Sequence, residues 1–139
     1  MNRRIFLLPF LYILSLPRAL AKEDNTIRII FPVTFKDKKR MKKVFMRIRG
    51  AINLWGTGVD IEVIAYDEGI AFLDRFESGE FEERISNLML YGVKFKACSV
   101  AMKMFGVSKE DLFEGVEVVR SGFEYHVLKV KEGYIPIYL

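Results

Sequence analysis

The chain has 139 residues, of which 51% are hydrophobic, with a formal net charge of +4, one cysteine and one histidine. This length fits one domain whose core is large enough to fold without disulfide bonds. A single cysteine excludes an intramolecular disulfide, and one cysteine with one histidine argues against a zinc site.

Residues 1–21 have the layout of a secretory signal peptide, which predicts a periplasmic or secreted protein. A basic start at Arg3 and Arg4 precedes an apolar run, and small residues end the segment at Ala19 and Ala21. The run is shorter than the ~20 residues that cross a bilayer, so cleavage is preferred over the alternative of an uncleaved membrane anchor. The mature domain, residues 22–139, is then expected to have no stable membrane insertion. Its net charge falls to +1, which gives no support for nucleic-acid binding.

The first half of this domain predicts two strands around one long helix. Residues 26–33 are rich in β-branched side chains and predict the first strand. The helix is expected to start at a capping-box spacing of Thr34 and Asp37 and to end at Gly56. Residues 59–66 alternate in polarity and predict the second strand. Apolar side chains give the helix one inward face: Met41, Val44, Phe45, Ile48, Ile52 and Trp55.

The second half continues the alternation of helix and strand. The expected helices cover residues 70–76, 79–91, 98–105, 108–111 and 121–132. The expected strands cover residues 93–97, 116–119 and 134–139. Three capping-box patterns and a glycine after most helices agree with this periodicity. Such alternation predicts a parallel sheet with helices on both faces, which is an α/β fold.

Basic residues gather at the start of the long helix. They could bind an anion or an acidic partner, but the inward apolar stripe of the same helix favours a solvated outer face. The cluster consists of Lys36, Lys38, Lys39, Arg40, Lys42, Lys43, Arg47 and Arg49. No glycine-rich phosphate loop follows the first strand, and the chain contains no G-x-S-x-G motif.

Cys98 is the candidate reactive residue, because it ends a predicted strand and starts a predicted helix. Ligands and reactive groups of open α/β sheets lie at the carboxyl ends of the strands, and helix-start N–H groups favour a thiolate. The alternative is a small buried side chain without reactivity, which is common for a lone cysteine. His126 falls in the last helix on an undefined face, so a structural or solvent role is preferred over a Cys–His pair.

Residues 92–139 combine a glycine-led strand that ends in Cys98, the run "GVSKEDL", the run "GVEVV" and a helix that closes in "EGY". This combination strongly resembles the carboxyl-terminal half of the DsrE/DsrF-like family. Residues 59–73 resemble the second strand of the family and a loop that often carries a glycine such as Gly69. The chain departs from many relatives at Tyr66, where they often have histidine, and at residues 99–102, where they have a polar run.

The resemblance implies a three-layer α/β/α fold with a five-stranded, mostly parallel, flavodoxin-like sheet. It also implies homo-oligomers, such as trimers or hexamers. Better-known members carry sulfur as a persulfide on a cysteine, which is Cys98 here. The chain is therefore expected to be an exported persulfide carrier in sulfur metabolism, with a sulfur-donor or acceptor protein as a partner.

Two alternatives to the sulfur carrier stay open. One is a non-catalytic homo-oligomeric binding module in which Cys98 is buried and inert. The other is a small-ligand binder that uses a crevice near Gly69 and Cys98. No metal or cofactor is expected in any of these cases, and the sequence leaves open whether the protein is an enzyme.

Overall fold

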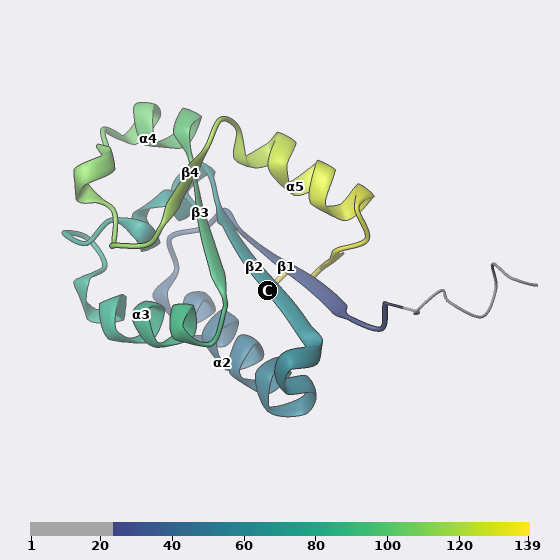
Figure 1. Ribbon diagram of the computed structural model, residues 1–139. Coiled ribbons are helices and arrows are strands. Elements are labelled where there is room, and N and C mark those ends of the chain that lie inside the picture. Colours follow the sequence, from purple (N-terminus) through teal and green to yellow (C-terminus); the bar gives the residue numbers. More distant parts are fainter. Residues whose placement is uncertain (1–23) are drawn as a thin grey trace, which may run out of the picture.

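The computed structural model describes residues 24–139, so the predicted signal peptide over residues 1–21 lies outside the described residues. Five strands form one sheet in the order β4-β3-β2-β1-β5, and every neighbouring pair is parallel (Figure 1). The strands are β1 (Ile27–Val33), β2 (Val59–Ala65), β3 (Lys94–Cys98), β4 (Glu117–Val119) and β5 (Ile135–Pro136). The predicted α/β class with a five-stranded sheet is confirmed.

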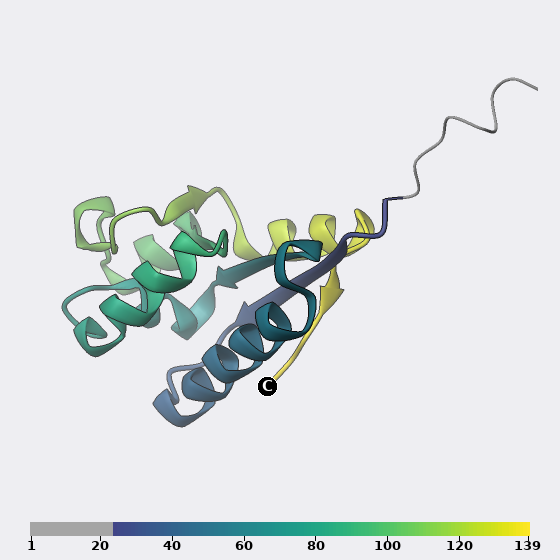
Figure 2. The ribbon, with the colours of Figure 1, turned by 60° about the horizontal axis from the view of Figure 1, so that its bottom comes forward.

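Helices cover both faces of the sheet and make the three layers. The helices α2 (Lys38–Trp55) and α3 (Glu82–Leu90) lie on one face, and α5 (Gly122–Lys131) lies on the other (Figure 2). The short α4 (Ser99–Phe105) follows directly from the end of β3. Four 3₁₀ segments complete the chain: Gly56–Gly58, Asp67–Leu73, Gly79–Phe81 and Lys109–Asp111.

The main hydrophobic core lies between the sheet and the pair α2 and α3. Alternate residues of β1 show the two faces, because Phe31 belongs to the main core while Ile30 packs with Ile64 and Tyr134 on the opposite side. Few apolar side chains are buried on that opposite side. Apolar burial therefore stabilises the packing of α5 on the sheet less than it stabilises the packing of α2.

Polar contacts hold α5 on its face of the sheet. Glu62, on β2, is 2% exposed and accepts a hydrogen bond from the Tyr125 hydroxyl at 2.7 Å. The Nζ of Lys129 lies 3.4 Å from the other Glu62 oxygen, an ion pair without hydrogen-bond geometry. Tyr134, just after α5, donates to the Asp60 carboxylate at 2.5 Å. This group of side chains is called the α5 polar cluster below.

Three element boundaries differ from the sequence-based expectation. The long helix is capped by Asp37 alone, whose side chain accepts the N–H groups of Lys39 and Arg40, so it starts after the predicted capping box. The 3₁₀ turns after β2 begin at Asp67, whose φ of 50° turns the chain as soon as the strand ends. Strand β5 pairs with β1 at two residues only, Ile135 and Pro136, and the N–H of Ile137 donates to the Ile30 oxygen at 2.9 Å just beyond them. Among the described residues, no helix has both the length and the apolar character to span a membrane.

Candidate functional site

Cys98 is the last residue of β3 and the N-cap of α4. Its Sγ accepts hydrogen bonds from the backbone N–H of Gly122 at 3.1 Å and of Ala101 at 3.4 Å. The residue is 4% exposed. Two N–H dipoles aimed at one sulfur favour negative charge on it, whereas burial away from water opposes that charge. Water therefore has little access to the sulfur, and backbone N–H groups take its place as hydrogen-bond donors.

Gly122 makes this contact sterically feasible. A Cβ at this position would lie 2.4 Å from the Cβ of Tyr66 and 3.0 Å from the Cβ of Cys98. Any side chain here would push the start of α5 away from the carboxyl ends of β2 and β3. The preceding Ser121 caps α5 by accepting the N–H of Glu124, which fixes where the helix begins. Gly122 therefore brings three elements together around the sulfur.

His126, one helical turn further along α5, lies between two tyrosines. Its Nδ1 is 3.1 Å from the Tyr66 hydroxyl, and its Nε2 is 2.9 Å from the Tyr138 hydroxyl. Burial lowers the pKa of His126 below its ordinary 6.5, which favours the neutral ring. A neutral imidazole has one N–H, so one tyrosine donates to the ring and the other accepts from it.

This arrangement leaves no nitrogen of His126 for Cys98. Both ring nitrogens are occupied by hydroxyl groups, and the sulfur is bonded to backbone N–H groups instead. Burial, with smaller contributions from the negative charges of neighbouring groups, raises the pKa of Tyr66 above 10.0, so its hydroxyl keeps its proton. The site consists of a backbone-bonded thiol beside a Tyr–His–Tyr hydrogen-bonded chain, and it lacks a Cys–His pair.

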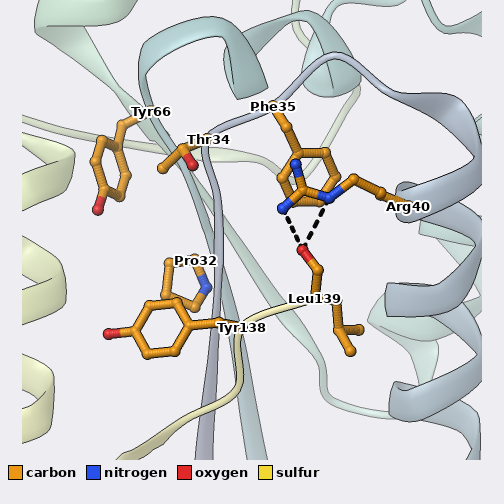
Figure 3. Close-up of a pocket in the computed structure, with 7 residues that line it drawn as sticks. All are labelled: Pro32, Thr34, Phe35, Arg40, Tyr66, Tyr138 and Leu139. Carbon is orange, nitrogen blue, oxygen red and sulfur yellow. Dashed lines mark hydrogen bonds between the residues drawn. The ribbon is translucent and has the colours of Figure 1, made fainter.

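A small hollow opens beside Tyr66 at the carboxyl ends of β1 and β2 (Figure 3). Its volume is about 90 Å³, and the residues that line it are Pro32, Thr34, Phe35, Arg40, Tyr66, Tyr138 and Leu139. The guanidinium of Arg40 stacks 3.8 Å from the Phe35 ring centroid and donates from Nε to the Leu139 backbone oxygen at 2.9 Å. Arg40 is therefore held in one orientation at the rim of the hollow.

The crevice expected near Gly69 is filled by the chain itself. A Cβ on Gly69 would lie 1.9 Å from the carbonyl oxygen of Val33, so the 3₁₀ turn packs directly against the end of β1. The N–H of Tyr66 also donates to that oxygen, at 3.1 Å. Gly69 serves close packing here, and neither Gly69 nor Cys98 lines the hollow beside Tyr66.

Sequence reasoning identified Cys98 but missed Tyr66, Gly122 and Tyr138 as its surroundings. Gly122 was the one available signal of close packing, because it follows the N-cap Ser121 directly, at a position that seldom requires glycine. Within residues 24–139, no three His, Cys, Asp or Glu side chains are grouped so that they could hold a metal ion.

A sequence model of the DsrE/DsrF-like family matches residues 28–138. The fold is similar to that of MTH1491 from Methanobacterium thermoautotrophicum, a protein of unknown function, with a TM-score of 0.76 and 33% identity over 81% of this chain and 99% of that chain. BT1422 from Bacteroides thetaiotaomicron, also of unknown function, has a TM-score of 0.66 at 17% identity and covers 81% and 94% of the two chains. The ychN protein from E. coli has a TM-score of 0.61 at 17% identity and covers 82% and 100%. No functionally curated protein matches the chain.

Proposed function

The chain belongs to the DsrE/DsrF-like family, and we propose that it is an exported carrier of sulfane sulfur, held as a persulfide on Cys98. The observation that carries this proposal is the pair of backbone N–H groups that point at the sulfur, from Gly122 and Ala101. These donors stabilise a thiolate, which is the nucleophilic form of cysteine. The carboxyl end of an interior strand, here β3, is also where α/β proteins place reactive groups.

The transfer is a thiol–persulfide exchange and needs no external oxidant. The Cys98 thiolate attacks the outer sulfur of a donor R–S–SH, and the S–S bond of the donor breaks. The electron pair leaves with R–S⁻, and Cys98 becomes Cys–S–SH. Delivery to an acceptor thiolate is the same exchange with the protein as the donor, so the carrier returns to its starting state.

The burial of Cys98 has a use in this chemistry. A persulfide is readily oxidised or attacked by other thiols, and a sulfur that is 4% exposed is protected from both. Tyr66 and the start of α5 at Gly122 pack beside Cys98. We expect sulfur loading to require a small displacement of these two residues.

Intact mass measurement tests the proposal. The mature protein is incubated with a persulfide donor at neutral pH, and we expect a gain of one sulfur atom that dithiothreitol removes. Cys98→Ser is the control variant and is expected to gain nothing. A parent protein that gains no sulfur from any donor would show that Cys98 is not a carrier.

The low exposure of Cys98 also favours a second candidate function, a non-catalytic binding module with an inert thiol. Iodoacetamide separates the two candidates in the folded protein. A carrier is expected to be alkylated in the folded protein about as fast as the same chain unfolded in urea, because its sulfur must be reached by donors. An inert buried thiol is expected to react slowly in the folded protein and faster only after unfolding.

Self-association is part of the proposal. An apolar stripe of α5 faces solvent at helical spacing, with Phe123 66%, Val127 49% and Val130 39% exposed. Such a stripe supports packing against a second copy or a partner protein of the sulfur transfer. Native mass spectrometry is expected to show a trimer or hexamer that Phe123→Ser dissociates. Amino-terminal sequencing of exported protein is expected to show cleavage after residue 21.

A further inference from the structure

Four large apolar side chains are exposed at the edge of the sheet where the strands begin, called the amino edge below. Leu54 and Trp55 end α2 shortly before β2, and Leu90 and Tyr91 lie at the end of α3 shortly before β3. Their exposed fractions are 74%, 43%, 85% and 72% in that order. The sequence periodicity predicted Trp55 on the inward face of α2, and this prediction is wrong at the last residue of the helix.

The turns that carry these side chains project from the molecule. Gly56, Gly58 and Gly92 follow the two helices, and a Cβ added at any of the three would meet no atom within 4 Å. A protein partner needs a surface of matching shape, whereas a bilayer deforms around single projecting side chains. Tryptophan and tyrosine are also enriched at the headgroup level of membranes. The residue types and their projecting positions therefore fit a lipid surface.

The charge of the amino edge complements an anionic lipid surface. The stretches 47–58 and 86–94 contain Arg47, Arg49 and Lys94 and no aspartate or glutamate. All three basic side chains are exposed, and in the described part of the chain none of them forms an ion pair. Basic residues next to exposed apolar ones are typical of segments that bind anionic membranes.

Two carboxylates at the starts of β1 and β2 already have partners. Asp24 is bonded to Arg28, and Asp60 accepts a hydrogen bond from the Tyr134 hydroxyl at 2.5 Å. By contrast, α5 carries both glutamate and lysine beside the apolar stripe that was assigned above to self-association. The amino edge thus differs from the α5 surface in charge as well as in position.

The chain enters the domain at the same edge. The described residues begin at Asp24, three positions before β1 starts at Ile27, so the predicted signal peptide joins the domain here. In Figure 1 the helices α2 and α3 end in the lower half of the molecule, where β1 also begins, whereas α4 lies at the top. An exported precursor is held at the membrane by its leader, which turns the amino edge toward the lipid before cleavage.

We propose that the amino edge docks reversibly on the surface of a bilayer that contains anionic phospholipids. Leu54 and Leu90 enter the apolar layer, while Trp55 and Tyr91 lie among the headgroups. The contact is superficial, and no segment crosses the bilayer. The seven residues of β1 span roughly 20 Å at ~3.3 Å per residue, so the opposite edge, with Cys98, is held about that far from the lipid. The inference does not depend on sulfur chemistry.

Trp55 is the only tryptophan of the chain, so its fluorescence reports on the amino edge alone. Residues 24–139 contain the five-stranded sheet and both helical layers, so the mature protein, residues 22–139, folds without the leader. It is mixed at low ionic strength with vesicles of phosphatidylglycerol and phosphatidylcholine in equal parts. We expect the emission to move to shorter wavelength and to be quenched by lipids with brominated acyl chains.

Vesicles of phosphatidylcholine alone are the matched lipid control. One basic residue near an anionic surface strengthens binding by roughly fivefold. With three such residues at the amino edge, we expect the neutral vesicles to bind at least about tenfold more weakly. Added salt is expected to weaken binding to the anionic vesicles and to leave binding to the neutral vesicles nearly unchanged.

Leu54→Gln/Leu90→Gln tests the apolar contact. Both side chains are exposed, so we expect the variant to stay folded and to lose affinity for vesicles by about tenfold or more. The control Phe76→Gln/Met104→Gln removes two side chains that are 73% and 70% exposed and that follow the carboxyl ends of β2 and β3. We expect this control to bind like the parent, and circular dichroism checks the fold of both variants.

Paired charge variants test the orientation. Arg47→Gln/Arg49→Gln is expected to weaken binding to anionic vesicles by about tenfold, at roughly fivefold or less for each residue. Lys39→Gln/Lys43→Gln removes the same charge roughly 10 Å nearer the start of α2, at about 1.5 Å per residue, and is expected to have a smaller effect. Equal effects of the two pairs would mean that α2 lies along the membrane over its whole length, which would overturn docking by the edge.

Three further results would overturn the inference. One is the absence of binding to anionic vesicles at low ionic strength. Another is binding that leaves the emission of Trp55 unchanged, because a different surface would then meet the lipid. The third is a shift of the emission with rising protein concentration in the absence of vesicles, which would mean that a second copy covers the amino edge. None of these results bears on sulfur loading at Cys98, so the carrier function is tested separately.

Discussion

The Sγ of Cys98 accepts the N–H of Gly122 at 3.1 Å, across a separation of 24 residues. The contact joins the end of β3 to the first residue of α5, although α4 and β4 lie between them in the chain. A residue proposed to carry sulfur is therefore also a structural contact between the sheet and the helix on its second face. Variants of these two residues separate the structural role from the chemical one.

Gly122→Ala is expected to destabilise the protein. The added methyl group would overlap the Cβ of Tyr66 at 2.4 Å and force the start of α5 outward. Overpacking of this kind costs about 1–3 kcal/mol. Urea denaturation monitored by circular dichroism gives the free energy of unfolding.

Gly50→Ala is the matched control for that substitution. Gly50 lies inside α2, and a Cβ there meets no atom within 4 Å. Because alanine is the better helix former in an open position, we expect a gain of roughly 0.5–1 kcal/mol. Loss of stability in both variants, or in neither, would contradict the packing seen around Gly122.

Cys98→Ala and Cys98→Ser are expected to differ in stability. Alanine leaves the buried N–H of Gly122 without an acceptor, which costs about 1–3 kcal/mol. The serine hydroxyl can accept the same N–H groups, so we expect a smaller loss in the free energy of unfolding. Equal losses would mean that the hydrogen bonds to sulfur contribute nothing to the fold, and both variants remain unable to carry sulfur.

Glu62→Gln tests the α5 polar cluster. Glutamine still accepts from Tyr125 but leaves the charge of Lys129, which is 21% exposed, without its buried partner. Removing one member of a fully buried pair costs about 3–5 kcal/mol, and the partial exposure of Lys129 reduces our expectation to about 1–3 kcal/mol. Thermal or urea unfolding at neutral pH measures the loss.

Glu132→Gln removes a second carboxylate from the same lysine and is the control. Glu132 is 57% exposed and lies 3.2 Å from Lys129, so we expect a loss of about 0–1 kcal/mol. Burial lowers the pKa of Lys129, but the two carboxylates outweigh it and raise the pKa above 10.5. The stabilisation by the pair is thus present at neutral pH and is lost as the pH rises through that raised pKa. A larger loss from Glu132→Gln than from Glu62→Gln would contradict this account.

His126 predicts a loss of stability in mild acid. Its pKa is lowered below 6.5 in the folded protein by burial, while the unfolded chain takes up a proton near the ordinary value. Below pH ~6.5 the unfolded state therefore binds more protons, and the free energy of unfolding falls by about 1.4 kcal/mol for each unit of lowering. His126→Asn is expected to flatten the dependence between pH 7 and pH 5. An unchanged pH dependence in the variant would assign it to other groups.

Most of the fold was predictable from sequence because its local signals agree. Helix caps such as Asp37 and Ser121, glycine stops and alternating apolar residues all predict the same order of elements. The misplaced start of α2 came from two polar residues, Thr34 and Asp37, that both suit a cap. The apolar run over residues 134–139 predicted a longer β5 than the structure has, since the strand pairs with β1 only at Ile135 and Pro136, with one further hydrogen bond from Ile137.

The site was predictable only as far as Cys98. Its surroundings are assembled from β2, α5 and the carboxyl-terminal segment, whose relative positions depend on tertiary packing. Nothing in the local sequence of His126 indicates that Tyr66 and Tyr138, 60 residues before it and 12 after it, occupy its two ring nitrogens. Long-range side-chain pairs of this kind depend on the order of the strands in the sheet. The hydrophobic periodicity of the sequence predicts the strands but not their order.

The two border strands of the sheet, β4 and β5, are only three and two residues long. Long unpaired strand borders invite edge-to-edge addition of further chains, and short ones offer little template for it. Copies of this protein are therefore poorly suited to joining through a continuous intermolecular sheet. Any assembly would have to use helix surfaces, which leaves the strand register unchanged by the number of subunits.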